Sequence, residues 1–210
     1  MTAGEIKGRR LAKALAHLGA ADPDMARAIA EIGPPPPRRS EPGFGGLLRI
    51  VLGQQLSVHA ARAIWDRLYA AAGPESLAPA RMLAFGDEEL ARIGLSRQKM
   101  RFARALAEAV GANHLDFTAL ERMADDAALA HLTAIHGIGQ WTAEVYLLFA
   151  LGRPDVMPAG DLALLVAAGK LKRKRKRPTP PQLRRMAEPW RPWRSVAARM
   201  LWHYYRNAPL

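Results

Sequence analysis

The sequence contains no cysteine and no long apolar run, and each absence excludes a class of structure. Without thiols the chain cannot form disulfides, thiolate zinc sites or cysteine-held iron–sulfur clusters. Its longest uninterrupted apolar runs, Val145–Leu151 and Leu162–Ala168, are far shorter than the roughly 20 residues of a membrane-spanning helix. Charged residues interrupt any signal-peptide core near residue 1. We therefore expect a soluble cytoplasmic protein, associated with the nucleoid in a prokaryote, with no membrane partner.

Acidic residues are scarce relative to basic ones. Nineteen Asp and Glu stand against 31 Lys and Arg, which gives a formal net charge of +12. A chain this basic attracts polyanions over a long range. Nucleic acid is the first candidate partner, an anionic membrane surface is the second, and a merely basic soluble enzyme is the third interpretation. Seven of the eight residues in Lys170–Arg177 are basic, which predicts either a solvated loop or an arm that contacts phosphates.

The hydrophobic pattern is helical along nearly the whole chain, and no strong period-two strand interrupts it. Asp22 followed by Pro23 is typical of a helix start, because the carboxylate caps free N–H groups and Pro suits the first helical position. Ser57, Ser96 and Asp161 are predicted to cap three further helices. The sequence therefore predicts a compact all-α protein with short helices, not a coiled coil.

The most informative stretch is residues 132–143, where a helix ends, a Gly-x-Gly turn follows and a second helix begins. Two glycines let the backbone approach another molecule closely, and the N–H groups at a helix start can bind a phosphate. A purely structural turn is the alternative. The residues predicted to bind the DNA backbone are Gly137, Ile138, Gly139, Gln140 and Thr142. The carbonyl groups that could hold a monovalent Na⁺ or K⁺ ion are those of Thr133, Ile135 and Ile138.

Three blocks resemble the helix-hairpin-helix (HhH-GPD) DNA glycosylase superfamily, in its 3-methyladenine DNA glycosylase II branch and in a short form without the N-terminal β-rich domain. These blocks are Leu52–Ser57, Gly137–Ala143 with Asp155–Leu162, and Trp190–Ser195 with Trp202, and Gly94–Lys99 adds to them. The resemblance implies one domain over 1–210, built from two helical lobes with a DNA-binding cleft between them. The expected lobes are 45–150, which carries the hairpin, and 1–44 with 155–210.

The resemblance implies that Asp161 is the catalytic carboxylate, and simple chemistry supports this role. Breaking the bond between a base and deoxyribose develops positive charge on the sugar, which a carboxylate in a cleft can stabilise. A carboxylate before a helix is most often only an N-cap, so the role depends on the hairpin that precedes it. Twenty residues separate Trp141 from Asp161, and this spacing matches the superfamily.

A base must leave the duplex before its glycosidic bond can be reached, so the protein needs an aromatic pocket and a wedge. The resemblance places Trp141 and Trp202 in the substrate-base pocket, and we add Tyr146 as a further candidate. Gln55 aligns with the residue that inserts into the duplex, and Gln54 is the neighbouring candidate. Both tryptophans could instead be core residues, and both glutamines could simply end a helix.

The resemblance predicts a monofunctional enzyme that releases alkylated purines of the 3-methyladenine and 7-methylguanine type from double-stranded DNA. Lyase relatives carry a Lys where this chain has Trp141, so no strand cleavage is expected. We expect a monomer that needs no cofactor. The alternatives are a glycosylase for deaminated or mispaired bases and a non-catalytic helix-hairpin-helix DNA-binding protein. Val145 departs from relatives that carry an aromatic there, which leaves the pocket's width open.

Overall fold

The structure, a computed structural model, describes residues 6–73 and 77–207. Within these residues it contains thirteen α-helices, one 3-10 helix and no β-strand, which confirms the all-α prediction. The helices are α1 (Gly8–Ala21), α2 (Pro23–Ile32), α3 (Gly43–Gly53), α4 (Val58–Ala72), α5 (Pro79–Ala84), α6 (Asp87–Ile93), α7 (Arg97–Gly111), α8 (Phe117–Arg122), α9 (Asp125–Thr133), α10 (Gln140–Phe149), α11 (Leu162–Leu171), α12 (Pro180–Met186), η1 (Glu188–Trp190) and α13 (Arg194–Asn207).

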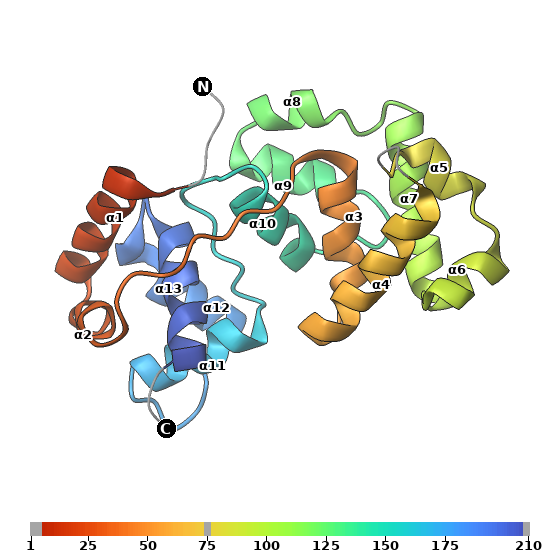
Figure 1. Cartoon of the computed structure of the whole chain (residues 1–210). Coiled ribbons are helices and arrows are strands. Elements are labelled where there is room, and N and C mark those ends of the chain that lie inside the picture. The colour runs from red at the N-terminus through yellow and green to blue at the C-terminus, as the bar shows by residue number, and fades with distance from the viewer. Residues whose placement is uncertain (1–5, 74–76, 208–210) are drawn as a thin grey trace. The chain divides into compact units, whose positions relative to one another are not determined.

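The chain divides into two compact units. The first comprises Met1–Arg39 and Leu147–Leu210, and the second is Ser40–Tyr146. The predicted lobe boundaries lie a few residues later in the chain. Because the first unit draws on both ends of the chain, its red and blue helices lie together in Figure 1.

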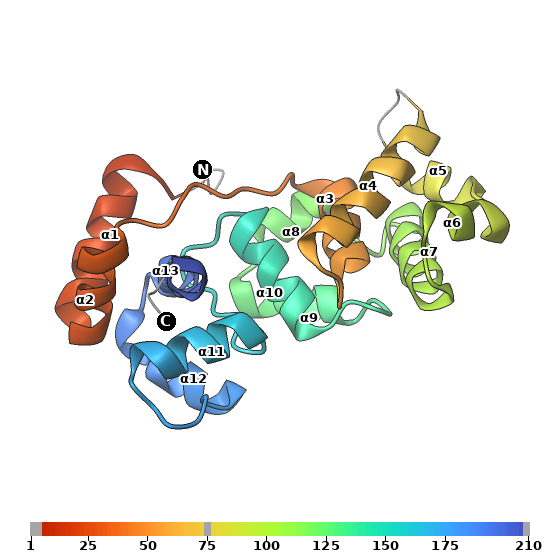
Figure 2. The same ribbon diagram turned by 60° about the horizontal axis from the view of Figure 1, so that its bottom comes forward.

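Helix α13 forms the centre of the first unit. It packs against α1, α2, α11 and η1 (Figures 1 and 2). Every residue of Ser195–Leu201 is buried, and a helix buried on all sides belongs in a core. Trp202 follows this stretch and is partly exposed. The core helix thus fixes the position of one predicted pocket residue.

Asp22 links three separate segments of the first unit. It caps α2 as predicted, because its Oδ1 accepts a hydrogen bond from the Asp24 N–H at 3.0 Å. Its Oδ2 accepts a hydrogen bond at 2.9 Å from Nε1 of the fully buried Trp190. Lys172 Nζ lies 2.5 Å from Asp22 Oδ1. Burial would lower the pKa of Lys172, but hydrogen bonds to Asp22 and Asp24 outweigh it and raise that pKa above its ordinary value.

Helix α3 forms the centre of the second unit, where it packs against α4 and α7. Ser57 caps α4 and Ser96 caps α7, which confirms both predictions. Each hydroxyl accepts a hydrogen bond from the N–H three residues later, at 3.2 and 3.3 Å. The Ser57 cap starts α4 directly after the segment that carries the two predicted wedge residues. The Ser96 cap starts α7 directly after Gly94–Leu95.

No helix in the described part of the chain is both long enough and apolar enough to cross a membrane. This agrees with the short apolar runs of the sequence.

Candidate active site

Asp161 lies at the start of α11 and is held by two N–H donors. Its Oδ1 accepts a hydrogen bond from the Leu164 N–H at 3.1 Å, which confirms the predicted cap. The same oxygen accepts a hydrogen bond from Trp202 Nε1, also at 3.1 Å. Met157–Ala159 are buried, Gly160 is exposed and Asp161 itself is partly exposed. The structure therefore presents an oriented carboxylate that follows a buried segment.

Trp202, a predicted pocket residue, belongs to an aromatic and cationic group beside this carboxylate. Its ring lies 5.3 Å from that of Phe149, with the two planes tilted by 31°. The guanidinium carbon of Arg38 lies 4.4 Å from the Phe149 centroid and 5.9 Å from the Trp202 centroid. Distances of this kind are typical of cation–π contacts, so this surface accepts positive charge.

Sequence reasoning missed Phe149 and Arg38. Phe149 ends the second hairpin helix, where an apolar residue gave no signal beyond core packing. Arg38 follows the Pro34–Pro37 run, and only the fold brings it to α10 and α13.

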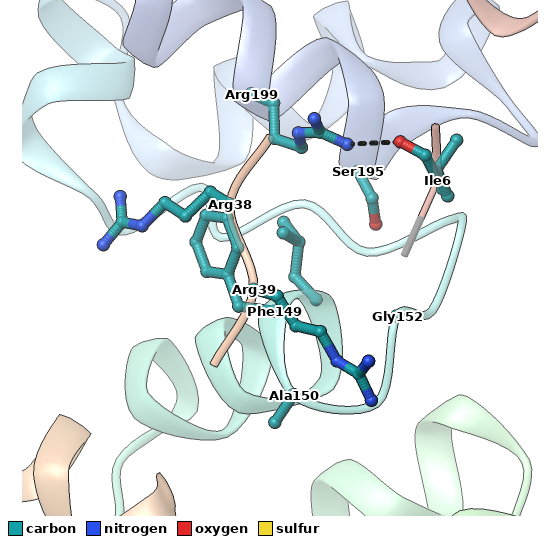
Figure 3. Close-up of a pocket in the computed structure, with 9 residues that line it drawn as sticks. Ile6, Arg38, Arg39, Phe149, Ala150, Gly152, Ser195 and Arg199 are labelled. Carbon is teal, nitrogen blue, oxygen red and sulfur yellow. Dashed lines mark hydrogen bonds between the residues drawn. The ribbon is translucent and has the colours of Figure 1, made fainter. Parts of the chain in front are cut away.

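A narrow cavity lies beside Phe149 (Figure 3). Arg199 borders it and donates a hydrogen bond to the Ile6 carbonyl at 2.9 Å. The cavity holds about 10 Å³, room for roughly one water molecule. It is a packing gap of the first unit and cannot contain a purine.

The Gly-x-Gly turn of the second unit joins α9 to α10, and its two glycines differ. Gly137 has a φ of +91°, and a Cβ there would lie 2.2 Å from the Phe102 ring. At Gly139 a Cβ would meet nothing within 4 Å. The fold itself therefore requires Gly137, whereas the space beside Gly139 is open and lets another molecule approach the backbone closely.

Gln54, the second predicted wedge residue, supports this turn in the structure, and its wedge role stays a prediction. Its Nε2 donates hydrogen bonds to the Gly137 carbonyl at 3.0 Å and to the Thr142 hydroxyl at 2.8 Å. Insertion into DNA would require this side chain to give up both hydrogen bonds. The Thr142 side chain is also buried, so this residue can offer a phosphate only its backbone. Ile138 is buried as well and anchors the turn.

Gln55 stays a candidate wedge residue. It is exposed and has a φ of +56°, an uncommon conformation for a residue with a side chain. Lys99 Nζ secures the preceding segment by bonding the Leu52 and Gln54 carbonyls at 2.5 and 2.9 Å, and burial lowers the pKa of this amine. Val58, 83% exposed, adds an apolar surface nearby in sequence.

Tyr146 does not have the environment expected of a pocket residue. It is fully buried, and its hydroxyl accepts a hydrogen bond from the Gly43 N–H at 2.8 Å. Burial raises the pKa of this hydroxyl to about 12. The ring lies 6.0 Å from that of Phe117. Tyr146 therefore packs inside the second unit, whereas Trp141 is partly exposed on α10. The pocket roles of both residues stay predictions.

The hairpin cation also stays a prediction. The Ile135 carbonyl accepts a hydrogen bond from the Ile138 N–H at 3.0 Å, and a carbonyl has a second lone pair with which it can bind an ion. Among the described residues, no group of three or more His, Cys, Asp or Glu could hold a metal ion.

Comparison with known proteins identifies the family. The model of the HhH-GPD superfamily of base excision DNA repair proteins matches residues 48–192. The chain belongs to this superfamily. A relative in Schizosaccharomyces pombe, DNA-3-methyladenine glycosylase 1, is 34% identical over 198 residues, which cover 91% of this chain and 86% of the relative.

Solved HhH-GPD structures share the fold. The S. pombe 3-methyladenine DNA glycosylase in complex with abasic DNA matches with a TM-score of 0.86 and 32% identity, over 93% of this chain and 98% of that one. A Bacillus halodurans DNA-3-methyladenine glycosidase matches with a TM-score of 0.78 and 32% identity, over 92% and 89% of the two chains. The family identification therefore rests on sequence and fold together.

Proposed function

We propose that the chain is a monofunctional DNA N-glycosylase that releases alkylated purines from duplex DNA by hydrolysis. The observation that carries this proposal is the Asp161 carboxylate, held at a helix start by Leu164 N–H and Trp202 Nε1. Relatives named for 3-methyladenine support the choice of lesion.

The carboxylate suits the chemistry of base release. As the glycosidic bond breaks, the sugar becomes positively charged, and a fixed negative group stabilises that charge without having to reorganise. Asp161 can also orient the attacking water or accept its proton. 3-Methyladenine and 7-methylguanine carry positive charge in DNA, so the aromatic faces of Trp141 and Trp202 would favour them. Position 141 carries no amine, so no Schiff base forms there and the strand stays intact.

The proposed partner is double-stranded DNA with a damaged base, bound by one copy of the chain. The N–H groups at the start of α10 and the open face of Gly139 would receive a phosphate. Gln55 would occupy the gap that the flipped base leaves. A Na⁺ or K⁺ ion on the turn carbonyls would strengthen the phosphate contact.

The test is the release of free base from duplex DNA that contains 7-methylguanine, measured in single turnover with Asp161→Asn. Asn keeps an oxygen for Leu164 N–H and Trp202 Nε1 but lacks the charge. We expect a rate loss of about 10²- to 10³-fold, the range measured when one preorganised electrostatic group is removed.

Asp116→Asn is the matched control, because Asp116 caps α8 with a 2.8 Å bond to the Thr118 N–H and is exposed. It should release base at the parent rate. Equal rates for Asp161→Asn and the parent would refute the catalytic role. Tight binding of damaged DNA by the parent, without base loss across alkylated and deaminated lesions, would favour a DNA-binding protein without catalysis.

A further inference from the structure

The segment between α11 and α12 carries a run of exposed positive charge. All five residues of 173–177 are Arg or Lys, and all are exposed. Among the described residues, none of these five side chains forms a hydrogen bond or an ion pair. Lys172, which precedes them, does the opposite, because it pairs with Asp22 and Asp24. The six basic residues of 172–177 are therefore divided into one structural cation, Lys172, and five unpaired ones.

The segment is a loop that is held against α11 at both ends. At its start, the Lys174 N–H bonds the Gly169 carbonyl at 2.9 Å, and Arg173 has a φ of +50°. At its end, a Cβ built on Gly169 would lie 3.2 Å from Arg177 Cα, and Pro178 is buried. The loop thus folds back onto α11. Like charges held together in this way are arranged before any ligand arrives, which reduces the ordering cost of binding.

Four of these five cations, those at positions 174–177, border an open hollow on the surface of the first unit. Its lining continues from the loop onto α12, where Arg185 adds a further positive charge. The hollow has a volume of about 1120 Å³. No exposed large hydrophobic side chain belongs to the loop or to α12 within the described residues. Protein interfaces depend on buried aromatic and aliphatic anchors, whereas phosphate contacts need only cations and N–H donors.

We propose that residues 173–177 and Arg185 bind the phosphodiester backbone of duplex DNA, as a second DNA-binding surface separate from the Gly137–Gly139 turn. This inference rests on the proposed function for its choice of DNA as the polyanion. The loop binds without reading sequence, because Lys and Arg contacts to phosphate carry no base information. It adds affinity for undamaged as well as damaged DNA, which serves an enzyme that must search long duplexes.

The test is the salt dependence of binding to an undamaged duplex, measured for a variant that carries Lys174→Gln, Arg175→Gln and Lys176→Gln. The slope of log affinity against log salt is negative, and each lost phosphate contact makes it shallower by about 0.9. We therefore expect the magnitude of the slope to fall by about 2 to 3 units. The matched control replaces three exposed cations at the start of the first unit, Lys7→Gln, Arg9→Gln and Lys13→Gln, and should change the slope by less than one unit.

The outcomes separate this inference from the proposed function. A slope equal to the parent's, or an equal fall in the control, would overturn the loop's role, while base release by the parent would leave the proposed function standing. The triple variant is also tested for binding to a polyglutamate chain. If it loses this binding but still binds DNA like the parent, the loop binds an acidic protein and the inference is overturned. Thermal unfolding of each variant shows whether the fold is intact, and Lys174→Gln alone, with an expected slope change near 1, serves if the triple variant is unstable.

Discussion

The turns before α10 and α11 both lead into the start of a helix, but they present different chemistry. The Gly137–Gly139 turn precedes α10 and offers backbone, because its Ile138 side chain is buried and Gly139 faces open space. The turn before α11 offers a side chain, because Met157–Ala159 are buried and Asp161 emerges from them with its carboxylate oriented.

The side chains that support the two turns also differ. A neutral amide, that of Gln54, donates to the Gly137 carbonyl of the glycine turn and to the Thr142 hydroxyl at the start of α10, so this support adds no negative charge that would repel a phosphate. The Asp161 turn uses an indole N–H, which donates to the carboxylate without cancelling its charge. The support of each turn thus suits the role proposed for it, phosphate binding for the glycine turn and a charged carboxylate for the Asp161 turn.

The largest expected effect is a difference in stability between substitutions at the two glycines of the hairpin turn. Gly137→Ala places a methyl group against the Phe102 ring at a φ that disfavours side chains, so we expect about 2–5 kcal/mol less stability in urea unfolding. Gly139→Ala has free space and should unfold like the parent, yet bind DNA more weakly. Equal stability for the two variants would mean that the turn can relax around Phe102.

The helix starts were predictable because local chemistry specifies them, and the family was predictable from a motif and its spacing. Asp22, Ser57, Ser96 and Asp161 each cap an N–H only two or three residues away. The hairpin and its spacing to Asp161 then indicated the superfamily, which comparison confirms.

The side-chain environments that were not predicted all depend on distant partners. Tyr146 bonds Gly43, which lies 103 positions away, and Gln54 bonds Thr142, which lies 88 positions away. Neither pairing leaves a periodic pattern in the sequence. Lys172 is a similar case, since its partner Asp22 lies 150 positions away and only the packing of α11 brings them together. A basic run therefore did not reveal which of its members is structural.

The next prediction tests whether Gln54 supports the glycine turn while the adjacent Gln55 inserts into the duplex. Gln54→Ala leaves the buried Thr142 hydroxyl and the Gly137 carbonyl without this donor, which should cost about 1–3 kcal/mol in urea unfolding. Gln55→Ala removes an exposed side chain and should leave stability unchanged while slowing base release from a duplex. Reversed results would exchange the two roles and make Gln54 the wedge.

The smallest expected effect concerns the support of Asp161. Trp202→Phe keeps an aromatic ring beside Phe149 but removes the Nε1 donor, so the carboxylate keeps the Leu164 N–H and loses orientation. We expect base release in single turnover to slow about 10-fold, which corresponds to roughly 1.4 kcal/mol, with little change in DNA affinity. Trp190→Phe is the matched control, because it removes the 2.9 Å bond to Asp22 in the same unit and should lower stability without changing the rate of the folded protein. If Trp202→Phe releases base at the parent's rate, the helix start alone orients Asp161. The two turns would then differ less in their support than the hydrogen bonds suggest.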